Sequence, residues 1–173
     1  IAIITGLMTK MSVGMFILFV VYASIAAIIH EIIVGIAAMY SGWFPSFAVA
    51  LITLLVGIMI GFPAIALTVM IGFTSATGPA FADMGYDLKT GYILRGNGKN
   101  KKYELDGRKQ QYISGLIAFT MAVILVGVSY HFLFADNLVP PVSKVFALTI
   151  KAGASATIAK EMAFWAIPGA IIQ

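Results

Sequence analysis

Apolar residues fill long, nearly unbroken runs along this chain, and short polar or Gly/Pro-containing stretches separate the runs. A helix that crosses a bilayer needs roughly 20 mainly apolar residues. The pattern therefore predicts an all-α fold, a polytopic transmembrane helix bundle that forms a single membrane domain. The predicted spans are residues 11–40, 46–62, 63–82, 110–134 and 143–159, followed by a truncated run at 162–173.

The last apolar run stops without a polar flank, which would leave backbone groups unpaired in hydrocarbon. We therefore expect the chain to be a fragment of a larger polypeptide. Composition supports the membrane assignment, because 61% of the residues are hydrophobic and only 10% are charged. A soluble domain has about 45–50% apolar and about 25% charged residues. The surplus apolar surface predicts contact with the lipid bilayer.

Charge is concentrated in one segment. Residues 83–109 hold seven of the eleven Lys/Arg residues and four of the seven Asp/Glu residues. This distribution predicts a charged cytoplasmic loop of a plasma-membrane protein that obeys the positive-inside rule. It argues against a nucleic-acid-binding surface. Within the segment, Gly96-Asn97-Gly98 predicts a turn rather than a phosphate-binding loop.

The third apolar stretch contains a segment rich in small, polar and helix-breaking residues, from Gly72 to Pro79. Irregular backbone inside a membrane has to be shielded by protein or line a wet cavity. We therefore predict a substrate cavity lined by Thr74, Ser75, Thr77 and Gly78. Close helix packing at small residues is the alternative explanation of the same pattern.

His30 and Glu31 are the only residues that interrupt the apolar run from position 11 to 40 with a side chain that can carry charge near neutral pH. Ionisable side chains inside a span are costly and often mark proton or ion pathways. We predict proton coupling at this pair, with an interfacial location as the alternative. Adjacent residues point about 100° apart on a helix, so metal binding would need ligands from elsewhere. We predict no metal site and no cofactor.

Two short motifs resemble the oligopeptide transporter family, which includes the yellow-stripe-like metal-chelate transporters. Asp87-Leu88-Lys89-Thr90-Gly91-Tyr92 matches the family's first motif, and Arg108-Lys109-Gln110-Gln111 matches its second. The resemblance covers roughly residues 40–135 and indicates a prokaryotic member. Residues 95–106 depart from it as an insertion between the motifs, which leaves the substrate open.

The resemblance implies proton-coupled import of small peptides or metal chelates. The motif residues are then candidates for a cytoplasmic gate, and orientation of the chain by their charge is the alternative. We predict a secondary active transporter that works by alternating access. A non-transporting membrane subunit and a passive channel remain alternatives, and a homo-oligomer is an open possibility. No nucleophile elbow, phosphate-binding loop or His-Glu-x-x-His motif is present, so we predict no enzyme.

Overall fold

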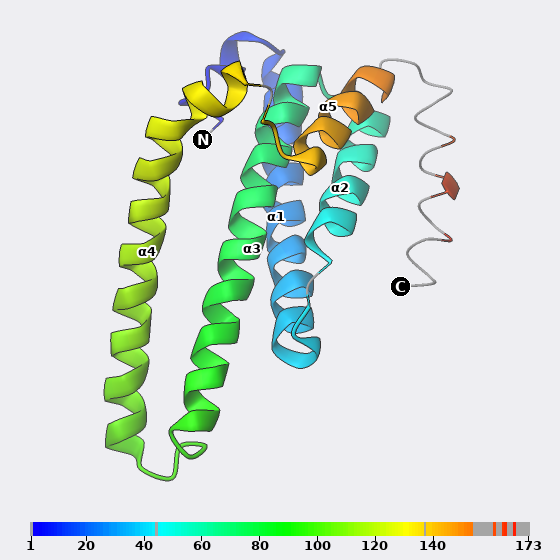
Figure 1. Cartoon of the computed structure of the whole chain (residues 1–173). Coiled ribbons are helices and arrows are strands. Elements are labelled where there is room, and N and C mark those ends of the chain that lie inside the picture. Colours follow the sequence, from blue (N-terminus) through cyan, green and yellow to red (C-terminus); the bar gives the residue numbers. More distant parts are fainter. Residues whose placement is uncertain are drawn as a thin grey trace.

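The computed structural model describes residues 2–43, 45–136 and 138–153, together with residues 161, 164, 165 and 168. The described residues contain α-helices and one short 3-10 helix, Leu7–Thr9, but no strand, which confirms the all-α prediction. The predicted run 162–173 and the end of the 143–159 span lie largely outside the described residues. The helices, shown in Figure 1, are α1 (Val13–Ser41), α2 (Ser46–Ile60), α3 (Ala64–Leu94), α4 (Lys101–Ala135) and α5 (Pro141–Gly153).

Local sequence explains where the helices begin and end. The Ser12 hydroxyl accepts a hydrogen bond from the amide of Met15, and this N-cap starts α1. Gly42 and Gly61 follow α1 and α2 in the left-handed conformation, which glycine adopts without steric cost. The Asn100 side chain caps α4 in the same way as Ser12 caps α1.

Three helices are long and apolar enough to cross a membrane: α1 with 29 residues, α3 with 31 and α4 with 35. They indicate a membrane protein. The predicted span 46–62 is realised as α2, which has only 15 residues. At 1.5 Å per residue α2 is roughly 22 Å long, which is shorter than the roughly 30 Å hydrocarbon core.

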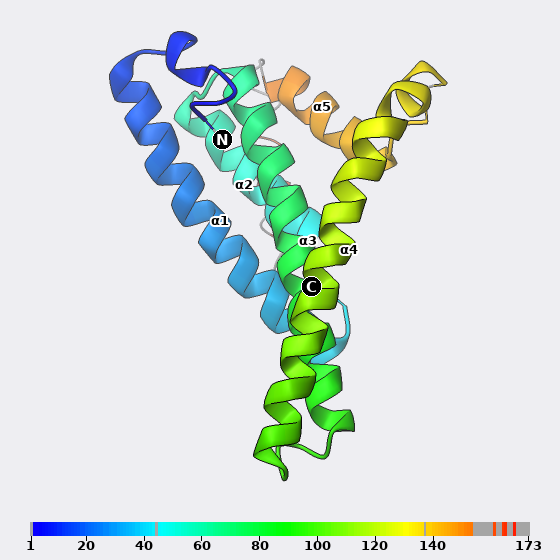
Figure 2. The same ribbon diagram turned by 90° about the vertical axis from the view of Figure 1, so that its left-hand side faces the viewer.

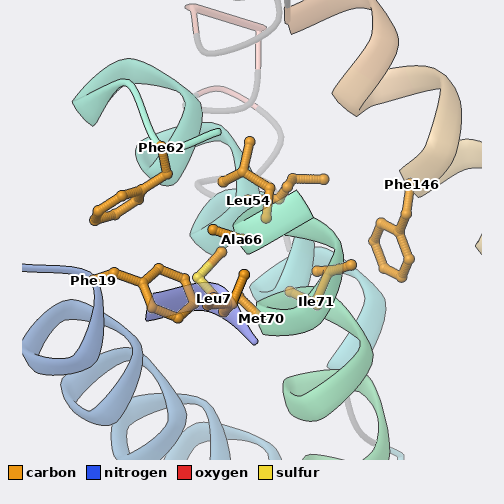
Figure 3. Close-up of a cluster of buried hydrophobic side chains, with 10 residues drawn as sticks. Leu7, Phe19, Leu54, Phe62, Ala66, Met70, Ile71 and Phe146 are labelled. Carbon is orange, nitrogen blue, oxygen red and sulfur yellow. The ribbon is translucent and has the colours of Figure 1, made fainter. Parts of the chain in front are cut away.

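A cluster of apolar side chains joins the first three helices to α5. Phe19 of α1, Leu54 of α2 and Met70 of α3 are almost completely buried in it, and Figure 3 shows them converging. Phe62, in the turn between α2 and α3, packs its ring edge to face against Phe19, with ring centroids 5.3 Å apart. This cluster fixes α1, α2 and α3 as one packed unit.

Residues 83–109 are mostly helical, so the prediction of a loop across this whole segment was wrong. The last three turns of α3 continue to Leu94, and α4 already begins at Lys101. Lys, Arg, Glu and Leu side chains favour helix, and contacts with neighbouring segments keep Gly85, Gly91 and Gly107 helical. The predicted turn is confirmed at its centre, where Gly96, Asn97 and Gly98 all have positive φ angles. Residues 95–100 are therefore the tip of a helical hairpin.

The expectation of irregular backbone between Gly72 and Pro79 was also wrong. The helix α3 runs through this segment, with Pro79 in its interior. Proline has no amide hydrogen, so Pro79 cannot bond to the carbonyl of Ser75 four residues earlier. The break therefore affects one hydrogen bond and leaves the helix continuous.

The fourth helix stands apart from the packed unit. Figure 2 shows α3 and α4 together at the hairpin tip, and α1 and α4 spreading apart toward their other ends. In the described part of the chain, no residue in the apolar part of α4 is buried. Its apolar faces are free to contact lipid or further helices.

Candidate functional site

His30 is the only ionisable side chain that the structure buries among the three packed helices in the described residues. It belongs to α1, and its side chain is completely buried. A Cβ atom added at Gly78 of α3 would lie 2.9 Å from Cε1 of the His30 ring. On its other side the ring faces α2, where Nε2 lies 3.4 Å from Oγ of Ser46. Gly78 therefore provides the space that the imidazole occupies.

The contact with Ser46 places the start of α2 at the level of His30, well before the end of α1. His30 lies eleven residues before the end of α1, or roughly 16 Å along the helix axis. The chain leaves α1 at Ser41 and returns to the level of His30 by Ser46, where α2 begins. The first amide groups of α2, which have no partner within the helix, therefore lie near the level of His30 rather than at the end of α1.

Three buried polar atoms of α1 and α3 have no hydrogen-bond partner in the described part of the chain. They are His30 Nδ1 and the hydroxyl oxygens of Ser75 and Thr77. Other hydroxyls in these helices bond to the carbonyl four residues earlier, as Thr53 and Thr68 do. A buried polar atom without a partner costs free energy comparable to a lost hydrogen bond. Such atoms are candidates for contact with a ligand or water.

The four residues predicted to line a cavity have different environments. Ser75 lines a cleft of about 440 Å³ between α3 and α5, which also involves Gly72. Thr74 is buried, and its hydroxyl donates to the carbonyl of Met70, so it does not line this cleft. Gly78 packs on His30 instead. The small residues of this segment thus serve helix packing as well as the cleft.

Glu31 differs from its neighbour His30. Its side chain is partly exposed, and no ion pair or hydrogen bond of its carboxylate is found within the described residues. The 100° step between adjacent residues explains this, because it turns Glu31 off the packed face. No cluster of three or more metal-ligating side chains occurs in the part of the chain that the structure describes.

The two family-like motifs meet where α3 crosses α4. The Gln111 side-chain amide donates to the carbonyl of Asp87 at 2.8 Å and accepts from the Arg95 guanidinium at 2.6 Å. Gly91 permits this contact, since a Cβ atom there would overlap the Gln111 amide. Asp87, Gly91 and Gln111 therefore form a structural joint between the helices.

Arg95 connects the joint to the hairpin tip. It donates two hydrogen bonds to the Glu104 carboxylate, at 2.9 and 3.1 Å, and Arg108 donates to the same carboxylate at 3.2 Å. Glu104 lies in the charged turns that precede the apolar part of α4. The hydrogen bonds from Arg95, with a smaller contribution from Arg108, lower the pKa of Glu104. The ion-pair network therefore keeps Glu104 ionised.

Lys89 binds the C-terminal end of α1, and Tyr92 binds the turn between α3 and α4. The Lys89 ammonium donates to the carbonyl of Met39 in the last turn of α1 and lies 4.6 Å from the centre of the Tyr40 ring. A cation is favourable there because the C-terminal end of a helix is partly negative. The Tyr92 hydroxyl donates to the carbonyl of Asn97 at 2.8 Å and so fixes the turn at the tip.

The other motif positions are more peripheral. Thr90 and Lys109 are exposed, and Gln110 lines a small pocket of about 390 Å³ between α3 and α4 together with Asp87. Sequence reasoning missed Ser46, because Ser46 reaches His30 only through the reversal of the chain between α1 and α2. It also missed the pairing of Arg95 with Glu104, although their opposite charges on either side of the predicted turn were a usable signal.

No family model, no curated protein and no solved structure matches this chain. A proposal of function therefore rests on the surroundings of His30, on the joint between α3 and α4, and on the sequence motifs.

Proposed function

We propose that this chain is the membrane-embedded part of a multi-pass secondary active transporter of the plasma membrane. It imports small peptides or metal chelates together with protons by alternating access. The observation that carries the proposal is the contact of His30 with the start of α2 inside the bundle. Discontinuous helices whose ends meet near the middle of the membrane are typical of transporter binding sites.

In this proposal His30 is the proton-binding group. Histidine changes its charge near neutral pH, and the uncharged ring fits its fully buried position. Protonation would place a cation between α1, α2 and α3, which favours separation of the helices or entry of an anionic group. Glu31, the adjacent carboxylate on the partly exposed side of α1, would deliver protons to the ring. Substrate would occupy the cleft beside Ser75.

The joint between α3 and α4 would be the point about which α4 tilts during this cycle. It supports a gating role for the motif residues Asp87, Lys89, Thr90, Gly91, Tyr92, Arg108, Lys109, Gln110 and Gln111, since four of them, Asp87, Lys89, Gly91 and Gln111, make contacts between helices. The resemblance of the same residues to the oligopeptide transporter family supports the proposed class of cargo.

Uptake into proteoliposomes with an inward proton gradient tests the proposal. Labelled short peptides and iron chelates are offered together, and uptake is compared with and without the gradient. We expect saturable uptake that the gradient accelerates, and loss of that acceleration in His30→Gln, which keeps a polar side chain but does not titrate. His131→Gln is the matched control, because His131 lies on the exposed surface of α4.

Each other outcome contradicts a defined part of the proposal. Conductance without saturation would identify a passive channel. No uptake by a folded protein would favour the non-transporting subunit. Full gradient-driven uptake by Glu31→Gln would remove Glu31 from the coupling pathway, and the same result for His30→Gln would refute the proposed proton site.

A further inference from the structure

The start of α4 carries a basic face that the transport proposal does not use. Successive helix residues are about 100° apart, so Lys101, Lys102, Arg108 and Lys109 fall within roughly 120° of one another around the helix axis. We call these four residues, with Leu105 between them, the basic face. All five side chains are exposed. Contacts with α3 come from the other side of α4, where Gly107 and Gln111 lie.

The cations of the basic face are available to an external partner. Lys101, Lys102 and Lys109 make no ion pair within the described residues. The nearby carboxylate of Glu104 is already held by Arg95 and Arg108. Asp106, at the edge of the face, forms no ion pair in this part of the chain. Residues 95–109 contain six basic and two acidic side chains, a net charge of +4, which equals the net charge of the whole chain.

Apolar side chains within the same face argue against a purely aqueous role. Leu105 lies in its middle and is 52% exposed, and Tyr112, one turn beyond Arg108, is 50% exposed. The stripe then continues into the apolar part of α4 through Leu116, which is 46% exposed. Along this side of the helix, basic side chains are therefore followed directly by aromatic and aliphatic side chains. This order matches the change from headgroups to acyl chains in a bilayer.

We propose that the basic face binds anionic phospholipids at the membrane surface. Lys109 precedes Tyr112 by three residues, or roughly 4–5 Å along the axis, which places it at headgroup level beside an interfacial tyrosine. Lys102 lies roughly 10 Å further out, which is still about one Debye length at physiological salt. Clusters of basic residues next to a membrane helix attract anionic lipids in this way. The proposal does not depend on transport.

Native mass spectrometry of the full chain in detergent tests the lipid preference. The protein is titrated with phosphatidylglycerol and, separately, with phosphatidylcholine of the same acyl chains. We expect tighter binding of phosphatidylglycerol that weakens as salt is raised. In a triple variant with Lys101→Gln, Lys102→Gln and Lys109→Gln, we expect phosphatidylglycerol affinity to fall by roughly a hundredfold, because each of the three basic residues near the surface contributes roughly fivefold.

Two matched triple variants separate the basic face from charge in general. Arginine at the same three positions keeps the charge and should bind like the wild type. Glutamine at Lys10, Lys144 and Lys151 removes the same charge elsewhere and should leave the preference unchanged. Equal binding of both lipids by the wild-type protein would refute the proposal, as would an unchanged preference in the first variant. Displacement of phosphatidylglycerol by equimolar inorganic phosphate would show that the face recognises phosphate alone and would also refute it.

If the glutamine variant at the basic face does not fold, as judged by circular dichroism, the salt dependence of wild-type binding decides. Affinity for phosphatidylglycerol that is unaffected by salt would exclude an electrostatic lipid site.

Discussion

Replacing Gly78 with alanine adds one methyl group at the point where α3 touches His30. That Cβ atom would lie 2.9 Å from Cε1 and 3.0 Å from Nε2 of the imidazole, closer than carbon and nitrogen atoms normally approach. Because the ring is completely buried, it cannot swing into open space. The substitution must therefore displace the ring or separate α1 from α3, and overpacking of this kind costs about 1–3 kcal/mol.

Alanine also favours helix over glycine by about 1 kcal/mol, which offsets part of this cost. Gly72→Ala measures that offset alone, because Gly72 lies in the same helix and a Cβ atom there meets nothing within 4 Å. We therefore expect Gly78→Ala to be less stable than Gly72→Ala by about 1–3 kcal/mol. The assay is reversible unfolding in mixed micelles, followed by the helical signal in circular dichroism.

A double-mutant cycle identifies the cause. When His30→Ala is combined with Gly78→Ala, the added methyl group has room, and the two effects should differ from additivity by about the overpacking energy. Equal stability of Gly78→Ala and Gly72→Ala would refute the packing of His30 on Gly78. Strict additivity in the double variant would show that any loss arises elsewhere in α3.

Two further predictions concern the hairpin. Because the pKa of Glu104 is lowered in the folded protein, its ion pairs stabilise the fold above the ordinary carboxyl range, and this stabilisation should be lost as pH falls. A melting temperature that declines less with acid in Glu104→Gln than in wild type would agree, whereas identical pH profiles would contradict it; Asp106→Asn is the control. Lys89→Met should lower the free energy of unfolding by about 1 kcal/mol, because the end of α1 loses its cation and Tyr40 loses its ring contact. Lys99→Met, at an exposed position in the turn, should leave stability unchanged in the same chemical unfolding assay, and an equal loss in both variants would argue against the contact.

The sequence was most informative where a helix is defined by its own residues. Apolar runs predicted α1 and the apolar part of α4 to within a few residues, since hydrophobic length alone decides a span. The turn around Asn97 was also predictable, because two flanking glycines supply the positive φ angles that it needs.

Prediction failed where tertiary contacts outweigh a local signal. Pro79 lies within a helix because only one backbone hydrogen bond is removed and the neighbouring turns remain packed. The charged residues around Asp87 were expected in a loop, but Gln111 and Arg95 pair their helix with α4. The contact between His30 and Ser46 depends on where the chain returns after α1, and no residue pattern encodes that return.

Because the joint at Gln111 holds α4 near one end only, a tilt of α4 at the joint moves its other end much further. The helix is held near one end by Arg95 and Gln111, and no residue of its most apolar window is buried in the described part of the chain. From Gln111 to Ala135 the arm is roughly 36 Å long, so a tilt of about 10° at the joint would sweep its far end through roughly 6 Å. Small adjustments among a few side chains at the hairpin would thus be amplified into large displacements at the opposite membrane surface.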